Sequence, residues 1–216
     1  PVMKIDFVSD IVCPWCAIGL SALEQAIERV GPSVPVSLHF QPFELNPDMP
    51  PEGQDIGEHL AQKYGLTPEQ VAANREMIRQ RGEGVGFTFR MEQRGRIVNT
   101  FNAHRLLHWA GERGGDAQHR LKKALLGAYF TEGQDPSDAA VLLRVVASVG
   151  LDEGRARQIL DGDDYAEAVR ERQRFYGRHG IRAVPSVILN DRHLIQGGQP
   201  VEVFEQALRQ VAAAEG

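Results

Sequence analysis

The chain has 216 residues, of which 42% are hydrophobic and 25% are charged, and its formal net charge is −5. This length favours one large domain or two small ones, and the composition is typical of a globular protein. The negative charge argues against a nucleic-acid or anionic-membrane partner, and no apolar run approaches membrane-spanning length. No basic and apolar leader precedes the first predicted strand, so we expect a cytoplasmic protein.

Residues 3–9 alternate apolar and polar side chains, which predicts a β-strand. The only two cysteines, Cys13 and Cys16, follow this strand in a Cys-Pro-Trp-Cys tetrapeptide. Apolar residues at helical spacing come next, and Gly31 ends the predicted helix. A Cys-x-x-Cys pair between a strand and a helix is the context in which two thiols form a redox couple.

The order of these residues predicts different roles for the two thiols. Pro14 suits the first helical turn, where its missing N–H would be unpaired, so Cys13 is the expected N-cap residue. The unpaired N–H groups and the helix dipole stabilise a thiolate there, and the thiolate is the nucleophile of disulfide exchange. Cys16, one turn later, is expected to resolve a mixed disulfide on Cys13. Pro14 and Trp15 shape the surroundings of the sulfur.

A cysteine pair can also have roles other than redox chemistry. Two cysteines can be small buried hydrophobic residues, and a Cys-x-x-Cys can be half of a zinc site. The zinc site needs a second pair of ligands, and the chain has no further cysteine. A bridge between Cys13 and Cys16 closes a very short loop and would add little stability. We therefore expect redox chemistry and no bound metal.

Residues 36–43 form a second alternating strand, so the first 43 residues indicate a β-α-β unit with parallel strands. A loop rich in proline and glycine covers residues 46–53. From there to about Gly180 the pattern predicts helices and no convincing strand. The predicted helices begin at or next to Thr67, Asn99, Asp116, Ser137, Asp152 and Asp164. The first of them is expected to end at about Arg81, because residues 82–86 form a glycine-rich break.

The last stretch returns to β structure, with a hairpin of residues 184–189 and 194–196 before a final helix that Pro200 opens. Neither β segment buries a sheet alone. We predict an α/β protein in which residues 1–45 and 180–216 form a thioredoxin fold, with a four-stranded mixed sheet and helices on both faces. Residues 46–179 would form a large helical insertion domain.

Four segments add to this pattern: Asp-Ile-Val-Cys-Pro-Trp-Cys at 10–16, Asn-Thr-Phe-Asn-Ala-His-Arg-Leu at 99–106, Ala-Val-Pro at 183–185 and Gly-Gly-Gln-Pro at 197–200. In these segments, and in the order of its elements, the chain resembles the DsbA-like branch of the thioredoxin superfamily. Within that branch it is similar to the FrnE-type subgroup of dithiol–disulfide oxidoreductases or isomerases. The resemblance covers nearly the whole chain.

The resemblance implies that Val184–Pro185 is a cis peptide bond packed beside the cysteine pair. The backbone of Val184 would then be free to pair with an extended substrate segment. The residues alone also allow an ordinary trans proline at a strand edge. The resemblance further makes Asn99 and His104 candidate substrate-binding residues.

The same polar residues have simpler interpretations. Asn99 could be only a helix N-cap, and His104 could be a core histidine that borders an apolar stripe. His104 and His108 have the i, i+4 spacing of a metal pair, but no third ligand is evident. Asp10 is either a turn residue or an aid to proton transfer at Cys16.

These observations predict an enzyme, a protein disulfide oxidoreductase or isomerase, that exchanges disulfides with protein or peptide substrates. It would need no cofactor beyond the Cys13–Cys16 pair, and glutathione is a second candidate co-substrate. The alternative is a glutathione-dependent transferase or 2-hydroxychromene-2-carboxylate isomerase-like enzyme, but such relatives carry Ser where Cys13 stands here. A third hypothesis is a holdase whose helical block presents an apolar groove.

Overall fold

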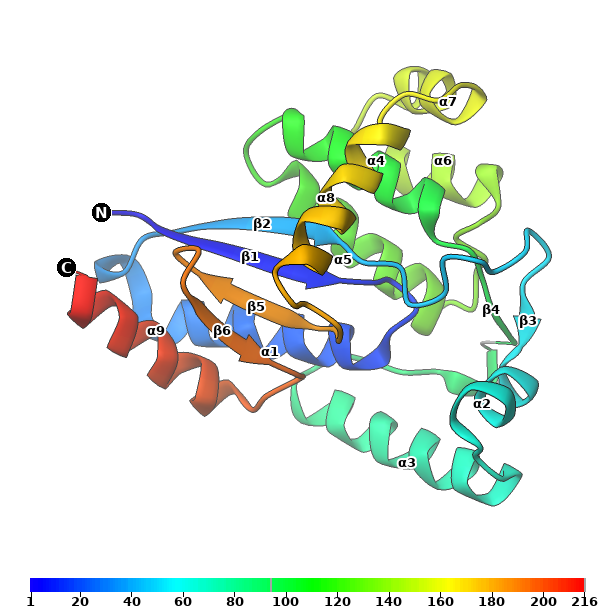
Figure 1. Cartoon of the computed structure of the whole chain (residues 1–216), viewed down its shortest axis with the longest axis horizontal. Helices are drawn as coiled ribbons and strands as arrows, with labels where there is room; N and C mark the ends of the chain where they lie inside the picture. The colour runs from blue at the N-terminus through cyan, green and yellow to red at the C-terminus, as the bar shows by residue number, and fades with distance from the viewer. Residues whose placement is uncertain (94, 216) are drawn as a thin grey trace.

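The computed structural model describes residues 1–93 and 95–215 and has a four-stranded mixed sheet, as predicted (Figure 1). Strand β1 (Met3–Ser9) pairs in parallel with β2 (Val36–Pro42). On its other edge β1 pairs antiparallel with β5 (Ser186–Leu189), which pairs with β6 (His193–Gln196). The chain therefore has the thioredoxin fold, and its strand order is β2-β1-β5-β6.

Helices cover both faces of this sheet, which explains why six of the seven residues of β1 are buried. Helix α1 (Pro14–Val30) and helix α9 (Val201–Glu215) lie together on one face (Figure 1). Helix α8 (Ala166–Arg178) crosses the other face next to β2. The end of β1 therefore lies between helices, and the cysteine pair follows it at the start of α1.

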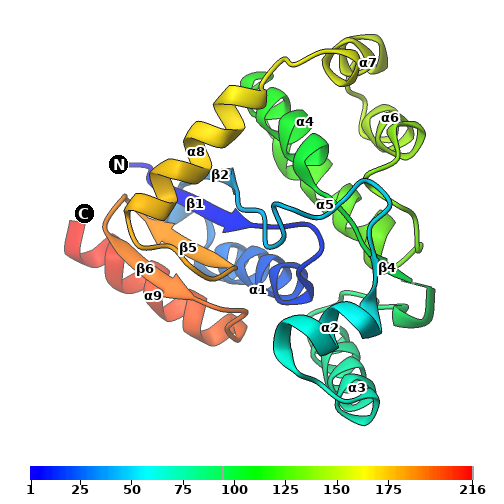
Figure 2. The same cartoon turned by 45° about the vertical axis from the view of Figure 1, so that its right-hand side comes forward.

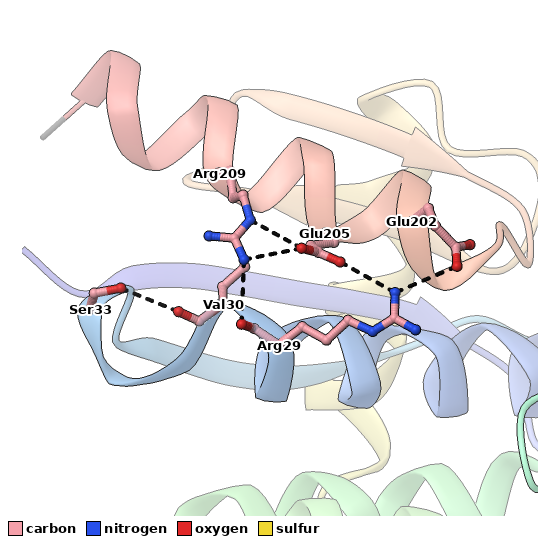
Figure 3. A network of polar contacts seen from close by, with 6 residues as sticks. All are labelled: Arg29, Val30, Ser33, Glu202, Glu205 and Arg209. Atoms are coloured by element: carbon pink, nitrogen blue, oxygen red, sulfur yellow. Dashed lines mark hydrogen bonds and ion pairs between the residues drawn. The ribbon is translucent and has the colours of Figure 1, made fainter.

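Helices α1 and α9 are joined by apolar packing inside and by ion pairs outside (Figure 3). Arg29 of α1 reaches Glu202 at 3.5 Å and Glu205 at 3.3 Å, and Arg209 contacts Glu205 at 3.0 Å. Arg209 also donates to the backbone carbonyl of Arg29. Because exposed ion pairs contribute little to stability, the buried residues of α9, such as Phe204, carry most of this contact.

The helical insertion lies between β2 and β5, as predicted, and surrounds the end of β1 on two sides (Figure 2). One apolar core continues from the sheet into these helices, so the division at residues 45/46 and 179/180 stays a prediction. Among the described residues no helix is long and apolar enough to cross a membrane. The helices of the insertion before α8 are α2 (Ile56–Tyr64), α3 (Pro68–Gly84), α4 (Phe101–Glu112), α5 (Ala117–Phe130), α6 (Ala139–Ser148) and α7 (Glu153–Asp161).

The expectation of no strand in the insertion is wrong. Strands β3 (Gln54–Asp55) and β4 (Arg96–Ile97) pair antiparallel in a small second sheet. Two residues are too short for an alternating pattern, so periodicity could not reveal them. Helix α2 was also missed, although Asp55 caps its first turn through the N–H of Glu58.

Several predicted helix starts move by one or two residues. Thr100, rather than Asn99, is the N-cap residue of α4, and Asp138, rather than Ser137, caps α6. Helix α8 begins at Ala166, because Tyr165 before it has a positive φ of 68°. Such shifts are expected because propensity places a helix better than its exact ends.

The predicted start of α3 is confirmed by a full capping box between Thr67 and Gln70. Its end differs from the prediction, because the helix continues through Gly82 to Gly84. A Cβ on Gly82 would lie 2.7 Å from the carbonyl oxygen of Phe87 and would also meet the ring of Phe89. Gly82 is therefore a close-packing position and not a break in the helix.

Candidate functional site

The cysteine pair lies where β1 ends and α1 begins. Cys13 is the N-cap residue of α1, with φ −96° and ψ 112°, and Pro14 occupies the first turn, as the sequence predicted. Both cysteines are free thiols. Cys13 is 5% exposed and Cys16 is fully buried, and the N–H of Cys16 donates to the carbonyl of Cys13 at 3.0 Å. Cys13 is thus the more accessible sulfur, and Cys16 lies one turn beneath it.

The loop before β5 forms one wall of the site. The Val184–Pro185 peptide bond is cis, as the family resemblance implied. The thiol of Cys13 donates to the carbonyl oxygen of Val184 at 3.8 Å, although 171 residues separate them. On the helix side, a Cβ on Gly19 would lie 3.1 Å from the side chain of Pro185, so only glycine fits there without a shift.

Trp15 packs against the loop after β6 and the end of α3. A Cβ on Gly198 would lie 3.0 Å from the carbonyl oxygen of Trp15 and 3.2 Å from its ring. Arg81 of α3 places its guanidinium 5.3 Å from the centre of the indole ring and donates to the carbonyl of Gly198 at 3.3 Å. The insertion therefore contributes a cation to the rim of the cysteine motif.

A buried carboxylate lies on the inner side of the motif. Asp10 is 1% exposed and accepts hydrogen bonds from the backbone N–H groups of Ile11 and Leu45, both at 2.9 Å. It also binds Nε2 of His104 at 3.0 Å. Burial alone would raise the pKa of Asp10, but the hydrogen bond and charge of His104 and the N–H of Leu45 bring it below its usual value. Asp10 is therefore held as a carboxylate.

Lys122 of α5 brings a second charge into this region, with a side chain that is 1% exposed. Burial lowers the pKa of Lys122, while the nearby charges of Cys16 and Asp10 favour its protonated form. Lys122 and His104 line a cavity of about 10 Å³, which is the space that one water molecule needs. The site thus brings the side chains of Lys122, Asp10 and His104 together close to Cys16.

Cys16 responds to these surroundings. Burial raises the pKa of the Cys16 thiol, and the hydrogen bond and charge of Cys13 raise it further. The charge of Lys122 acts in the opposite direction. Cys16 is therefore a protonated thiol at rest, and a cation stands close to the place where a thiolate would form.

The structure brings Cys13, Pro14, Trp15 and Cys16 together with Val184 and Pro185, whereas the other two predicted residues make contacts within the protein. His104 is 2% exposed and bound to Asp10. Asn99 donates to the carbonyl of Met49 at 3.0 Å and accepts from the N–H of Phe101 at 2.9 Å. The substrate-binding role of Asn99 and His104 stays a prediction.

His104 and His108 have the spacing of a metal pair but make other contacts. Nε2 of His104 binds Asp10, and the ring of His108 packs against Tyr165 at 5.5 Å.

Sequence reasoning did not identify Arg81 or Lys122. Lysine and arginine are common on helix surfaces, where their stems cover apolar residues, so neither position stands out. For Lys122 the one available signal is its position beside Leu121 and one turn before Leu125 and Leu126, which are all buried.

The likeness to known proteins extends over the whole chain. A curated Bacillus subtilis protein, the uncharacterized protein YwbO, is 28% identical over 207 residues, which are 95% of this chain and 96% of the relative. The structure of a probable DsbA oxidoreductase from Streptomyces coelicolor is 31% identical, with a TM-score of 0.89. The alignment covers 99% of this chain and 92% of that one.

Two more distant structures share the fold. The cytosolic disulfide reductase DsbM from Pseudomonas aeruginosa, solved with GSH, is 19% identical with a TM-score of 0.66 and covers 97% of this chain and 99% of its own. A 2-hydroxychromene-2-carboxylate isomerase is 14% identical with a TM-score of 0.70 and covers 99% and 100%. The DsbA-like thioredoxin domain matches residues 4–209. The chain therefore belongs to the DsbA-like thioredoxin domain family.

Proposed function

We propose that the protein is a thiol–disulfide oxidoreductase of the oxidase or isomerase type that exchanges disulfides with protein or peptide substrates. The observation that supports this most strongly is the position of Cys13. Cys13 is the N-cap residue of α1, and its thiol faces the carbonyl oxygen of Val184, with Cys16 buried one turn below. An extended substrate segment beside Val184 would place its own sulfur against that of Cys13.

In the oxidising direction the pair begins as a Cys13–Cys16 disulfide. A substrate thiolate attacks the sulfur of Cys13, the bond between the two cysteines breaks, and Cys16 leaves with the electron pair. A second substrate thiolate then attacks the substrate sulfur of the mixed disulfide and releases Cys13 as a thiolate. The substrate loses two electrons and the cysteine pair gains two. Reduction of a substrate disulfide follows the same steps in reverse, and an isomerase uses both halves.

Lys122 and Asp10 have separate tasks in this scheme. The thiolate of Cys16 forms in a fully buried place, where an unpaired negative charge is costly. The nearby charge of a protonated Lys122 offsets this cost. The carboxylate of Asp10 holds His104 and the N–H of Leu45 in position.

A glutathione-dependent isomerase or transferase is the second candidate, because an isomerase of that kind has the same fold over the whole chain. A cysteine at position 13 and a buried thiol at position 16 oppose it, since such a reaction needs no resolving thiol. Glutathione as co-substrate, the cytoplasmic location and the absence of a cofactor stay predictions.

The test compares the wild type with Cys13→Ser and Cys16→Ser in exchange with a disulfide-bonded peptide. We expect Cys13→Ser to abolish exchange, and Cys16→Ser to trap a mixed disulfide that intact mass spectrometry detects. Retained exchange in Cys13→Ser would refute the proposal. Isomerase activity with glutathione that survives Cys16→Ser would favour the second candidate.

A further inference from the structure

Two arginines near the end of α3, Arg79 and Arg81, differ in their carboxylate partners. Arg79 is held by two carboxylates, Glu76 at 2.7 Å and Glu83 at 2.8 Å. Arg81 is exposed, and within the described part of the chain it has no carboxylate partner. Its one hydrogen bond, to the carbonyl of Gly198, is long at 3.3 Å. Most N–H groups of this guanidinium therefore have no partner among residues 1–93 and 95–215.

The position of Arg81 is defined by packing on three sides. Helix α3 is largely exposed, but Ile78 enters the core and Gly82 lies against the ring of Phe89. The end of α3 is thereby held beside the loop between β6 and α9 (Figure 1). The guanidinium carbon of Arg81 lies 5.3 Å from the centre of the Trp15 ring. A guanidinium held by a ring and one carbonyl keeps N–H groups available for a planar, doubly hydrogen-bonded partner.

The N–H groups of Arg81 border the approach to the reactive sulfur. Trp15 is two residues from Cys13, and its ring fills the space between Arg81 and Gly198. A substrate bonded to Cys13 lies next to the carbonyl of Val184, and Trp15 of the same tetrapeptide carries Arg81 beside it. The group that matches a free arginine edge is a carboxylate.

We infer that Arg81 determines substrate specificity by binding a carboxylate close to the reacting sulfur of the substrate. The preferred substrates are thus peptide thiols with an acidic side chain or a free C-terminal carboxylate next to their cysteine. This rests on the exchange function proposed above. The whole chain carries a net charge of −5, so its long-range field repels such substrates, and the preference has to come from this local contact.

The experiment uses four peptide disulfides that differ only beside the cysteine. Three have amidated C-termini and carry Glu, Gln or Lys at the neighbouring position, and the fourth carries Gln and ends in a free carboxylate. The kcat/KM of exchange is measured for the wild type, Arg81→Gln, Arg81→Glu and the control Arg79→Gln. The ratio between peptides is the decisive quantity, since a general structural defect lowers all four values together.

We expect the wild type to prefer a carboxylate-bearing peptide over its neutral match about five- to tenfold, the usual effect of one hydrogen-bonded ion pair. Arg81→Gln should bring this ratio to about one, Arg81→Glu should favour the Lys peptide, and Arg79→Gln should keep the wild-type ratio. The arm that responds, Glu side chain or C-terminus, identifies the source of the carboxylate.

Equal ratios in the wild type and Arg81→Gln would overturn the inference while exchange itself remains. If the wild type exchanges with none of the peptides, the proposed function fails first.

Discussion

The side chain of Lys122 is only 1% exposed. Its charge therefore affects both the stability of the fold and the chemistry proposed for the cysteine pair. The folded protein binds the proton of Lys122 more weakly than the unfolded chain, because burial lowers its pKa from 10.5. Between the lowered value and 10.5 the unfolded state holds more protons, so this residue makes stability rise with pH. At neutral pH the burial of Lys122 therefore lowers the free energy of unfolding.

We predict that Lys122→Met stabilises the protein at pH 7 by about 1–3 kcal/mol, as removal of buried charge often does. It should also abolish the rise of stability towards pH 10. The same change removes a cation that interacts with the negative charge of a Cys13 thiolate, which the disulfide lacks, so the reduced form becomes less stable. The reduction potential should therefore become more negative, by about 30 mV for each 1.4 kcal/mol.

Urea unfolding at pH 7 and pH 10 and a glutathione redox titration measure these effects. Lys123→Met is the matched control, since Lys123 is the next residue of α5 but is exposed and paired with Glu24. A potential that moves equally in both variants would contradict a local role of Lys122.

At the scale of elements, the end of α3 shows how one glycine decides the position of a helix. Gly82 lets the last turn approach Phe87 and Phe89, whereas Gly84 has open space around its Cα. Glycine alone marks a break in a helical pattern, which is why the sequence predicted an end before Gly82. Only the contact with residues 87–89 shows that the helix continues.

We predict that Gly82→Ala destabilises the protein by about 1–3 kcal/mol, because the added methyl group overpacks the contact with Phe87 and Phe89. Gly84→Ala should be neutral or stabilising by about 0.5 kcal/mol, since alanine reduces the entropy of the unfolded chain. Thermal unfolding of both variants tests this. Equal effects of the two substitutions would mean that the close contact at Gly82 is unimportant.

The elements with a strong local pattern were predicted well. Strand β1, helix α1, the hairpin and the last helix all appear where periodicity and turn residues placed them. The two-residue strands β3 and β4 escaped because they exist only through their pairing. Helix α2 escaped because its nine residues bury just Ile56 and His59.

At the scale of the whole molecule, Asp10 joins segments that are distant in the sequence. It connects the loop after β1 with Leu45 after β2 and with His104 of α4. Because its pKa is below 3.8, Asp10 stabilises the fold above that value, and the contribution is lost as pH falls through the lowered pKa. The pH dependence that Glu44 contributes has the opposite sign. Burial raises the pKa of Glu44 above 4.5, so the stability of the fold increases as this carboxylate is protonated.

We predict that the urea midpoint of the wild type falls steeply below pH 3.8, the usual pKa of aspartate. Asp10→Asn should lower stability at pH 7 by about 3 kcal/mol, since it leaves a buried pair without one partner. The variant should also lose part of the acid dependence. Glu44→Gln is the control and should keep the steep loss. The same acid profile in Asp10→Asn and the wild type would contradict this assignment.

The sequence by itself determined the fold class, the order of the main elements and the position of the cysteine pair between a strand and a helix. These follow from local patterns, because alternation, helical spacing and the Cys-Pro step at a helix start leave their mark within a few residues. The cis bond at Pro185 came from family resemblance and agrees with the structure. The division into two domains and the roles of Asn99 and His104 stay predictions.

Only the tertiary structure decided what surrounds the two sulfurs. Asp10 meets His104 across 94 residues, and Arg81 meets Gly198 across 117. Lys122 became a core residue through the packing of α5 against α4, β2 and α1. Contacts of this kind depend on how elements pack in space, and a charged side chain carries the same letter whether it faces solvent or a buried thiol.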